Sequence, residues 1–351
     1  MAWLSGLTAP RMGRNLPTDR WGQGLARRSR LGWNPLLIVR STHILVLNHN
    51  GRGLLGECLP SLLEAARRSP VPCRVTVVDN DSTDDSPAFL AEEWPEVGLI
   101  REPNRGLASF NAVLGRLDEP VVLLLNNDVK LEPDSLGPLL EPFGREDDAL
   151  FTAPACWTFD GQDYEGMRTR VRTRFGLVQG LCRVPGHESV IGTPDLTASA
   201  GPVLAVDRER FLAIGGYDPI FFPGRIEDLD LGFRGWMAGW RGYYAPASIA
   251  YHKGFGSFGP AFGRRGCDRL ASRNTFLFAW KNLTGWRLAE HLAWLPARVA
   301  FALATRRVDF CLALFDALAR LGKVVEARKA LAVGQGGWTI RQEAFFERFR
   351  F

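Results

Sequence analysis

Short apolar runs alternate with segments of helical periodicity through the first third of the chain. Each run is four or five residues long and rich in Val, Leu and Ile, as in a buried strand. Between the runs, apolar residues recur every three or four positions, as in a helix packed on one face. Alternating strands and helices predict parallel βαβ units, and so an α/β sheet covered by helices on both faces. The predicted strands are 43–47, 74–78, 97–101 and 121–125, and the predicted helices are 54–68, 86–94 and 104–117.

The pattern changes further along the chain. A strand at 203–206, helices at 208–214 and 230–238 and a strand at 241–251 are expected, whereas 151–200 is less regular. Beyond residue 264 only helical spacing remains. We therefore expect three parts: a basic, loosely ordered arm, an α/β domain and a helical region. Their ranges are 1–38, 39–263 and 264–351.

Charge is distributed unevenly over the 351 residues, whose total is +5. Residues 1–40 hold seven arginines and one aspartate, a net charge of +6. Residues 41–263 hold 20 basic and 30 acidic residues (−10), and residues 264–351 hold 16 and 7 (+9). Basic flanks suit an anionic membrane surface or an anionic glycan. Nucleic acid is not expected as a partner, because it would need a basic face on the central part.

The six cysteines contain no CxxC pair, which argues against a zinc site or a disulfide framework. The first 40 residues lack the apolar core of a signal peptide, and no window of 18 residues is apolar and uncharged. We expect a cytoplasmic protein.

Polar clusters follow three of the predicted strands, at residues 48–50, 79–81 and 126–128. Ligands of open α/β sheets bind beyond the carboxyl ends of the strands. The three clusters are therefore expected to share one site.

Three carboxylates lie within four residues at Glu227, Asp228 and Asp230. Clustered carboxylates repel one another, so they are most useful around a cation or where one acts as a base. Together with Asp128, they indicate an enzyme that acts on a nucleotide-linked substrate.

A glycine motif, G-x-G-x-x-G over residues 51–56, suggests a dinucleotide-binding turn, with Asp79 downstream. In that turn the first glycine directly follows the strand. Here three polar residues intervene, so we interpret the glycines as a flexible loop.

These features in order resemble the family 2 glycosyltransferases of GT-A fold, most closely the rhamnosyltransferase-like and galactofuranosyltransferase-like members. The resemblance runs from about residue 43 to residue 282. Its motifs are the strand end at Asn48, the turn at 77–84, the segment N-R-G-L-A with Asn111, and the segments at 125–129, 215–234 and 251–254. It implies a nucleotide-sugar half at 39–135 and an acceptor half at 136–263. One position departs from the family pattern, because Asn126 replaces the first acid of the D-x-D metal motif.

The resemblance also assigns roles. It implies that Asp228 is the general base, with Glu227 as runner-up, and that Asp128 and His252 hold Mg²⁺ or Mn²⁺ on the diphosphate. One base without a nucleophile implies a single displacement with inversion. Donor-binding residues would be Asn48, Asp79, Asn80, Arg105, Asn111 and Asn127, and acceptor-side residues would be Gly201, Asp230, Arg234 and Trp236.

The implied reaction moves a sugar from dTDP-rhamnose or a UDP-sugar to a hydroxyl of a cell-surface glycan or a lipid-linked acceptor, as in polysaccharide and cell-wall biosynthesis. Two alternatives stay open: a sugar-1-phosphate nucleotidyltransferase, and a degenerate relative that only binds glycan. The apolar and basic helices of residues 287–332 suggest peripheral contact with the inner face of an anionic membrane. A helical hairpin packed on the α/β domain is the competing interpretation.

Overall fold

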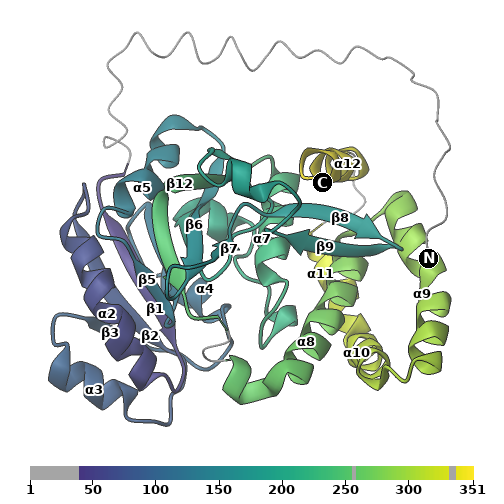
Figure 1. Ribbon diagram of the computed structural model, residues 1–351, viewed down its shortest axis with the longest axis horizontal. Helices are drawn as coiled ribbons and strands as arrows, with labels where there is room; N and C mark the ends of the chain where they lie inside the picture. The colour runs from purple at the N-terminus through teal and green to yellow at the C-terminus, as the bar shows by residue number, and fades with distance from the viewer. Residues whose placement is uncertain (1–38, 255–257, 332–336) are drawn as a thin grey trace, which may run out of the picture.

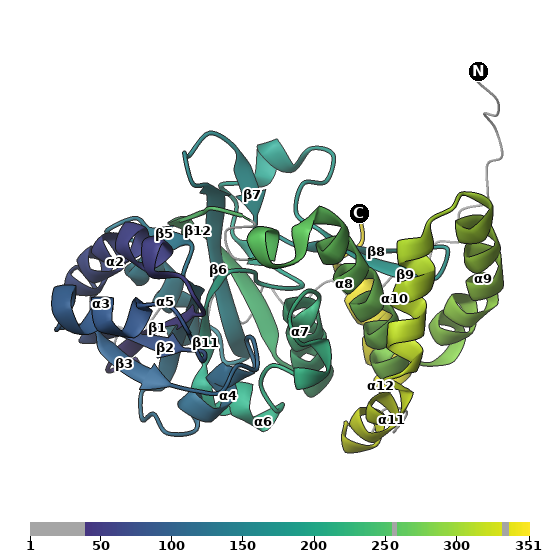
Figure 2. The ribbon, with the colours of Figure 1, turned by 90° about the horizontal axis from the view of Figure 1, so that it is seen from below.

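The computed structural model describes residues 39–254, 258–331 and 337–351 (Figure 1). The arm predicted at 1–38 lies outside the described residues. An α/β body forms one end of the molecule, and helices α9 and α10 form the other (Figures 1 and 2).

A ten-stranded mixed sheet forms the centre of the body. Eight strands follow the order β10-β12-β6-β11-β4-β1-β2-β3, while β5 pairs with β12 and β7 pairs with β6. The first four strands along the chain pair in parallel, as predicted from their apolar runs. β11 then pairs antiparallel with both β4 and β6, while β6 and β12 are parallel to each other. The strands of this parallel group are β1 (Thr42–Asn48), β2 (Cys73–Asp79), β3 (Gly98–Arg101) and β4 (Val121–Asn126).

Helices cover both faces of this sheet. The crossovers from β1 to β2 and from β2 to β3 run in one direction, so α2 and α3 lie on one face, and the returning α4 lies on the other beside α6 (Figure 2). Apolar side chains of these helices and strands form one continuous core. The predicted α/β class is confirmed. These helices are α2 (Arg52–Arg67), α3 (Ser86–Glu93), α4 (Ser109–Leu114), α5 (Leu136–Arg145) and α6 (Arg208–Ala213).

The second half of the body completes the sheet and adds a separate hairpin, β8–β9. α7 follows the short 3₁₀ turn η3 and leads directly into the long strand β12. The elements are β5 (Val129–Leu131), β6 (Ala149–Thr158), β7 (Tyr164–Gly166), β8 (Arg170–Arg174), β9 (Leu177–Leu181), η2 (His187–Val190), β10 (Asp195–Leu196), β11 (Val203–Asp207), η3 (Pro219–Phe221), α7 (Glu227–Ala238) and β12 (Arg241–His252).

The last part of the chain is helical, as expected. Its inner side chains build a second core together with α7 and the β8–β9 hairpin, centred on Phe233 and Phe345. The boundary expected at residue 264 falls inside α8, directly after a break in the helix at Gly263. In the described ranges, no helix is long and apolar enough to span a bilayer. The helices are α8 (Phe258–Asn282), α9 (Gly285–Ala304), α10 (Val308–Leu318), α11 (Leu321–Ala330) and α12 (Trp338–Arg348).

Three predicted segments differ from the observed ones. The helix expected at 104–117 is confined to α4, because residues 104–107 form a turn around Asn80. The helix expected from residue 230 begins three residues earlier, at Glu227. The glycine motif at 51–56 is not a loop, because α2 begins at Arg52 and Gly51 is its N-cap residue.

Candidate active site

The polar clusters meet at one edge of the sheet, as expected for parallel strands. Asn48 and Asp79 are register partners at the ends of β1 and β2, and Asn126 ends β4 beside them. The Asn127 amide donates to Asn48 Oδ1 at 2.7 Å, and both side chains are buried. A Cβ on Gly51 would lie 2.0 Å from Asn127 Nδ2. A glycine is therefore required there to let α2 begin against this amide pair.

Asp79 lines a pocket of about 660 Å³ between the ends of β2 and β3. Its carboxylate is buried, and Oδ1 has no hydrogen-bond partner among the described residues. A buried acceptor left without a donor is costly, so this atom suits a ligand N–H or O–H group. The lining is mainly acidic, which disfavours a phosphate here. It includes Asp79, Asp81, Asp84, Asp85, Arg101 and Glu102.

Asn80 is committed to shaping the next loop. Its Nδ2 donates to Asn104 Oδ1 at 3.1 Å and to the Gly106 carbonyl at 3.3 Å, and its Oδ1 accepts from Ser109 Oγ at 2.5 Å. The side chain is buried, so it positions the 104–109 segment that leads into α4. Arg105 is exposed on that segment and lines a narrow pocket that Glu227 also lines.

Asp128 and His252 are brought together by the pairing of β5 with β12. His252 Nε2 lies 3.4 Å from Asp128 Oδ1, and His252 Nδ1 lies 2.7 Å from Glu165 Oε2 on β7. Burial lowers the pKa of His252, but the two carboxylates outweigh it and raise the pKa to about 9. Sequence reasoning missed Glu165, because no motif marks it and only the β6–β7 pairing places it here.

This pair fits a divalent metal in part. Asp128 Oδ1 is buried and lacks a hydrogen-bond donor in the described structure. Glu165 binds Nδ1 of the His252 imidazole, and carboxylates commonly orient metal-bound histidines in this way. No cluster of three or more His, Cys, Asp or Glu residues that could hold a metal occurs within the described ranges. A metal here would therefore take two protein ligands, with its other positions left for phosphate or water oxygens.

Glu227 and Asp228 form the first turn of α7. The turn is set by Arg225 and Ile226, whose φ angles of 81° and 73° are in the left-handed region, where non-glycine residues are strained. Burial and the neighbouring Glu227 carboxylate raise the pKa of Asp228 well above its ordinary value. Burial also raises the pKa of Glu227. A carboxylate with a raised pKa at a strained turn is suited to accept a proton.

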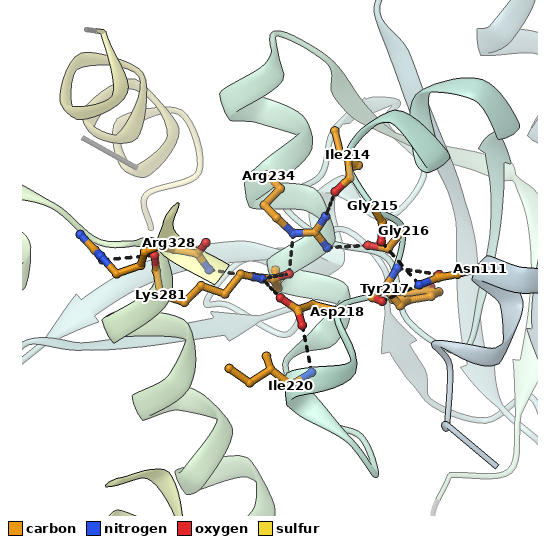
Figure 3. Close-up of polar contacts among 12 residues, drawn as sticks. Asn111, Ile214, Gly215, Gly216, Tyr217, Asp218, Ile220, Arg234, Lys281 and Arg328 are labelled. Carbon is orange, nitrogen blue, oxygen red and sulfur yellow. Dashed lines mark hydrogen bonds and ion pairs between the residues drawn. The ribbon is translucent and has the colours of Figure 1, made fainter. Parts of the chain in front are cut away.

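Tyr217 holds Asp228 in place. Its hydroxyl donates to Asp228 Oδ1 at 3.3 Å, and this bond lowers the pKa of Asp228, opposing the two larger effects. Asn111 on α4 clamps the Tyr217 backbone, accepting from its N–H at 2.9 Å and donating to its carbonyl at 2.8 Å (Figure 3). The structure thus places Asn111, which was predicted to bind the donor, beside the loop that carries Tyr217, with its amide bound to that backbone.

A buried charge cluster supports α7 from the helical region. Asp230 is fully buried and accepts from Arg234 Nε at 2.7 Å, from Lys281 Nζ at 2.8 Å and from Asn282 Nδ2 at 2.7 Å. Lys281 of α8 also pairs with Asp218 at 2.6 Å. Arg234 reaches the carbonyls of Ile214 and Gly216 (Figure 3).

The predicted acceptor-side residues do not gather around a common surface. Asp230 and Arg234 are enclosed in the cluster just described, so neither can touch an acceptor directly. Trp236 packs edge-on against Phe345 and Phe349 and donates to the Arg341 carbonyl of α12. Gly201 lies beside the end of β4, where a Cβ would be 2.7 Å from Met167 Cε.

The mixed α/β sheet has carboxylates at its strand ends, and α7 adds a pair of carboxylates with raised pKa values, an arrangement suited to an enzyme site. Residues 43–191 match the model of the Glycosyl transferase family 2. Residues 43–191 are therefore similar to the glycosyltransferases of family 2, and they lie in the α/β sheet that the sequence predicted.

Curated relatives agree with this class. The chain is 29% identical over 268 residues to an N-acetylglucosaminyl-diphospho-decaprenol L-rhamnosyltransferase of Mycobacterium tuberculosis, covering 66% of this chain and 81% of the relative. It is 25% identical over 215 residues to a putative polypeptide N-acetylgalactosaminyltransferase 10 of Drosophila melanogaster, covering 57% and 34%.

Two solved structures cover most of the chain. The mannosyltransferase PcManGT from Pyrobaculum calidifontis, in complex with GDP-Man and Mn²⁺, has a TM-score of 0.47 at 18% identity and covers 89% of this chain and 88% of its own. S. aureus TarS 1–349 in complex with UDP-GlcNAc has a TM-score of 0.49 at 16% identity and covers 88% and 89%.

Proposed function

We propose that this glycosyltransferase moves a sugar, with inversion, from a pyrimidine-nucleotide diphosphate donor to a hydroxyl of a cell-surface glycan or its lipid-linked precursor. dTDP-rhamnose and UDP-sugars are the candidate donors. The relative from Mycobacterium tuberculosis supports this choice, because it is named as an enzyme that transfers rhamnose to a diphospho-decaprenol-linked sugar. An acceptor of that kind would require the enzyme to work at a membrane surface.

The observation that carries the proposal is the Asp228 carboxylate. It is partly buried, has a raised pKa and is held by Tyr217. In the proposed reaction Asp228 takes the proton of the acceptor hydroxyl while its oxygen attacks the anomeric carbon. Glu227, next to it, raises the proton affinity of Asp228 and so makes it a stronger base.

The donor is proposed to extend along the strand ends. Asp79 would accept hydrogen bonds from a ring N–H or a ribose hydroxyl, since its Oδ1 lacks a donor in the described structure. Asn48 and Asn127 would line the path towards the diphosphate, and Arg105 would reach a phosphate from its exposed position. Asn80 contributes by holding the loop that presents Arg105.

Asp128 and His252 would hold Mg²⁺ or Mn²⁺ in this scheme. When bound, the metal neutralises the charge that develops on the departing diphosphate. Glu165 would fix the ring of His252, and the buried Asp128 carboxylate would supply the negative charge that draws a cation to this edge.

The isosteric change Asp228→Asn tests the function. It removes the base and leaves the fold and donor pocket intact, so sugar transfer should fall by about 10²–10⁴-fold. Binding of the donor should persist, measured as an undiminished rise in melting temperature with UDP or dTDP. The matched control is Asp163→Asn, at an exposed aspartate of the β6–β7 turn. Near-normal turnover of Asp228→Asn would refute the assignment.

The donor class has a separate test. dTDP-rhamnose, UDP-sugars and GDP-mannose are compared for thermal stabilisation of the wild type and of Asp79→Asn. Pyrimidine donors should stabilise the wild type, and Asp79→Asn should lose most of that gain, because its amide presents a donor where an acceptor is needed. Equal stabilisation by GDP-mannose would contradict the pyrimidine preference.

A further inference from the structure

Helix α9 has its apolar residues on the outside. Its twelve exposed residues are all glycine or apolar, whereas its charged residues Arg287, Glu290 and Arg298 are partly buried. A surface helix of a water-soluble protein normally has the opposite arrangement, with its polar face towards solvent. The exposed residues are Gly285, Trp286, Ala289, Leu292, Ala293, Trp294, Pro296, Ala297, Ala300, Phe301, Leu303 and Ala304.

Helix α10 continues this surface. Val308, Leu312, Phe315 and Leu318 recur at helical spacing and are all exposed, and α10 packs against α8 and α9 on its other side. Phe315 is 71% exposed and Leu303 of α9 is 66% exposed. We name the exposed apolar residues of α9 and α10 the α9–α10 surface. Contiguous apolar exposure of this kind marks a site of interaction.

The surface is held rigidly. His291 is the one titratable side chain of α9 that is fully buried. Its Nε2 accepts from Trp280 Nε1 at 3.0 Å, and its Nδ1 donates to the Gly176 carbonyl at 2.8 Å. Phe175, on the same β8–β9 turn, packs at a tilt against Trp294 with ring centroids 4.9 Å apart. The exposed face is therefore a fixed feature of the fold and not a frayed helix.

Charge decides between the two main occupants. The chain from His291 to Val308 contains three arginines and no acid, and Arg306 and Arg307 are exposed at the turn between the two helices. A second copy would bring the same positive turn into the interface. An anionic bilayer matches both properties, because apolar side chains enter the acyl boundary while arginines meet lipid phosphates.

We propose that the α9–α10 surface docks on an anionic lipid bilayer, with the Arg306–Arg307 turn at the headgroups. The two helices would lie in the membrane interface without crossing it. Helices α9 and α10 lie at the end of the molecule away from α2 and α3 (Figures 1 and 2). The inference goes beyond the proposed reaction and does not depend on it.

The test uses the full chain and vesicle flotation. The wild type should float with vesicles that contain phosphatidylglycerol and much less with pure phosphatidylcholine, and high salt should weaken the binding. The double variant Leu303→Glu/Phe315→Glu should reduce the bound fraction at least tenfold. Arg306→Gln/Arg307→Gln should reduce binding to anionic vesicles while leaving the weak binding to neutral vesicles unchanged.

The matched control is Ile340→Glu, which adds the same charge at an apolar residue that is 77% exposed on α12. It should bind vesicles as the wild type does, and all variants should keep the wild-type melting temperature with UDP. The proposal is overturned if the wild type does not float, or if Leu303→Glu/Phe315→Glu binds as well as Ile340→Glu. It is also overturned if sedimentation shows a dimer that this double variant dissociates.

Discussion

At the scale of single residues, two side chains to which the sequence assigned no role hold two of the residues to which it assigned one. Tyr217 and Glu165 each bind a functional candidate, Asp228 in one case and His252 in the other. Glu165 and His252 are 87 residues apart in the chain, whereas Tyr217 and Asp228 are 11 residues apart. Their effects on the site are therefore separable by conservative substitution.

Tyr217→Phe should shift the pH dependence of transfer. The tyrosine hydroxyl lowers the pKa of Asp228, so its removal raises that pKa further. A base with a higher pKa is protonated at higher pH, so the acid limb of kcat/KM should move to higher pH. Activity at neutral pH should fall roughly tenfold, as for a lost bond of about 1.5 kcal/mol to a charged group.

The control for this change is Tyr243→Phe, which removes a tyrosine bond to a carboxylate, Asp148, away from the site. Its acid limb should match that of the wild type. An unchanged acid limb in Tyr217→Phe would show that the hydroxyl does not act on the base.

Glu165→Gln should weaken metal binding. The carboxylate holds the Nδ1 side of His252 at 2.7 Å, and loss of such a partner commonly costs about 10–100-fold in metal affinity. Titration of Mn²⁺ against the chelated protein, followed by calorimetry or electron paramagnetic resonance, measures this without turnover. Glu141→Gln, at an exposed glutamate of α5, is the control. Equal Mn²⁺ affinity in both variants would remove Glu165 from the metal site.

At the scale of elements, α7 depends on a helix from outside the α/β body. Asp230 at its start is neutralised by Lys281 of α8, and Gly232 allows α7 to approach the Ala198 carbonyl, where a Cβ would be 2.0 Å away. Phe233 packs against Phe278 and Phe345 of the helical region. The first turn of α7, with its two carboxylates, is therefore positioned from both sides.

Lys281→Met should be strongly destabilising. The change removes the ion pairs of Lys281 with Asp218 and with the buried Asp230. Removing one partner of a buried ion pair lowers the free energy of unfolding by about 3–5 kcal/mol. Urea denaturation gives the difference in unfolding free energy. The control Arg145→Met breaks an exposed pair with Glu141 and should cost at most about 0.5 kcal/mol. A similar small cost for Lys281→Met would mean that the cluster is not structurally important.

The local pattern of apolar and polar residues predicts most helices and strands, but it predicts few of the contacts that hold α7 in place. β1, β2, β3 and β4 were predictable to within a residue or so, because buried parallel strands are short apolar runs with polar ends. The start of α7 was not, since Arg225 and Ile226 adopt a left-handed backbone that their residue types do not favour. The partners of Asp230 were also out of reach, because Lys281 lies 51 residues away on another helix.

At the scale of the whole molecule, the two cores meet at α7, which contributes Leu231 to the first and Leu229 and Phe233 to the second. The first core contains the sheet, and the second joins α7 to the C-terminal helices. The predicted division of the body at residue 264 remains a prediction, but the packing gives the helical region a direct part in shaping the site. The α9–α10 surface is then connected to α7 through α8.

A series of contacts also links the pocket lined by Asp79 with Asp228, the proposed base. Asn80, next to Asp79, holds the 104–109 segment, α4 presents Asn111, and Asn111 clamps Tyr217 at Asp228. A nucleotide that orders the first of these contacts would order the last. We expect substrates to bind in sequence, the activated sugar before the acceptor, with the free nucleotide leaving last. Product inhibition by UDP or dTDP should then be competitive against the donor and noncompetitive against the acceptor, and the reverse pattern would exclude this order.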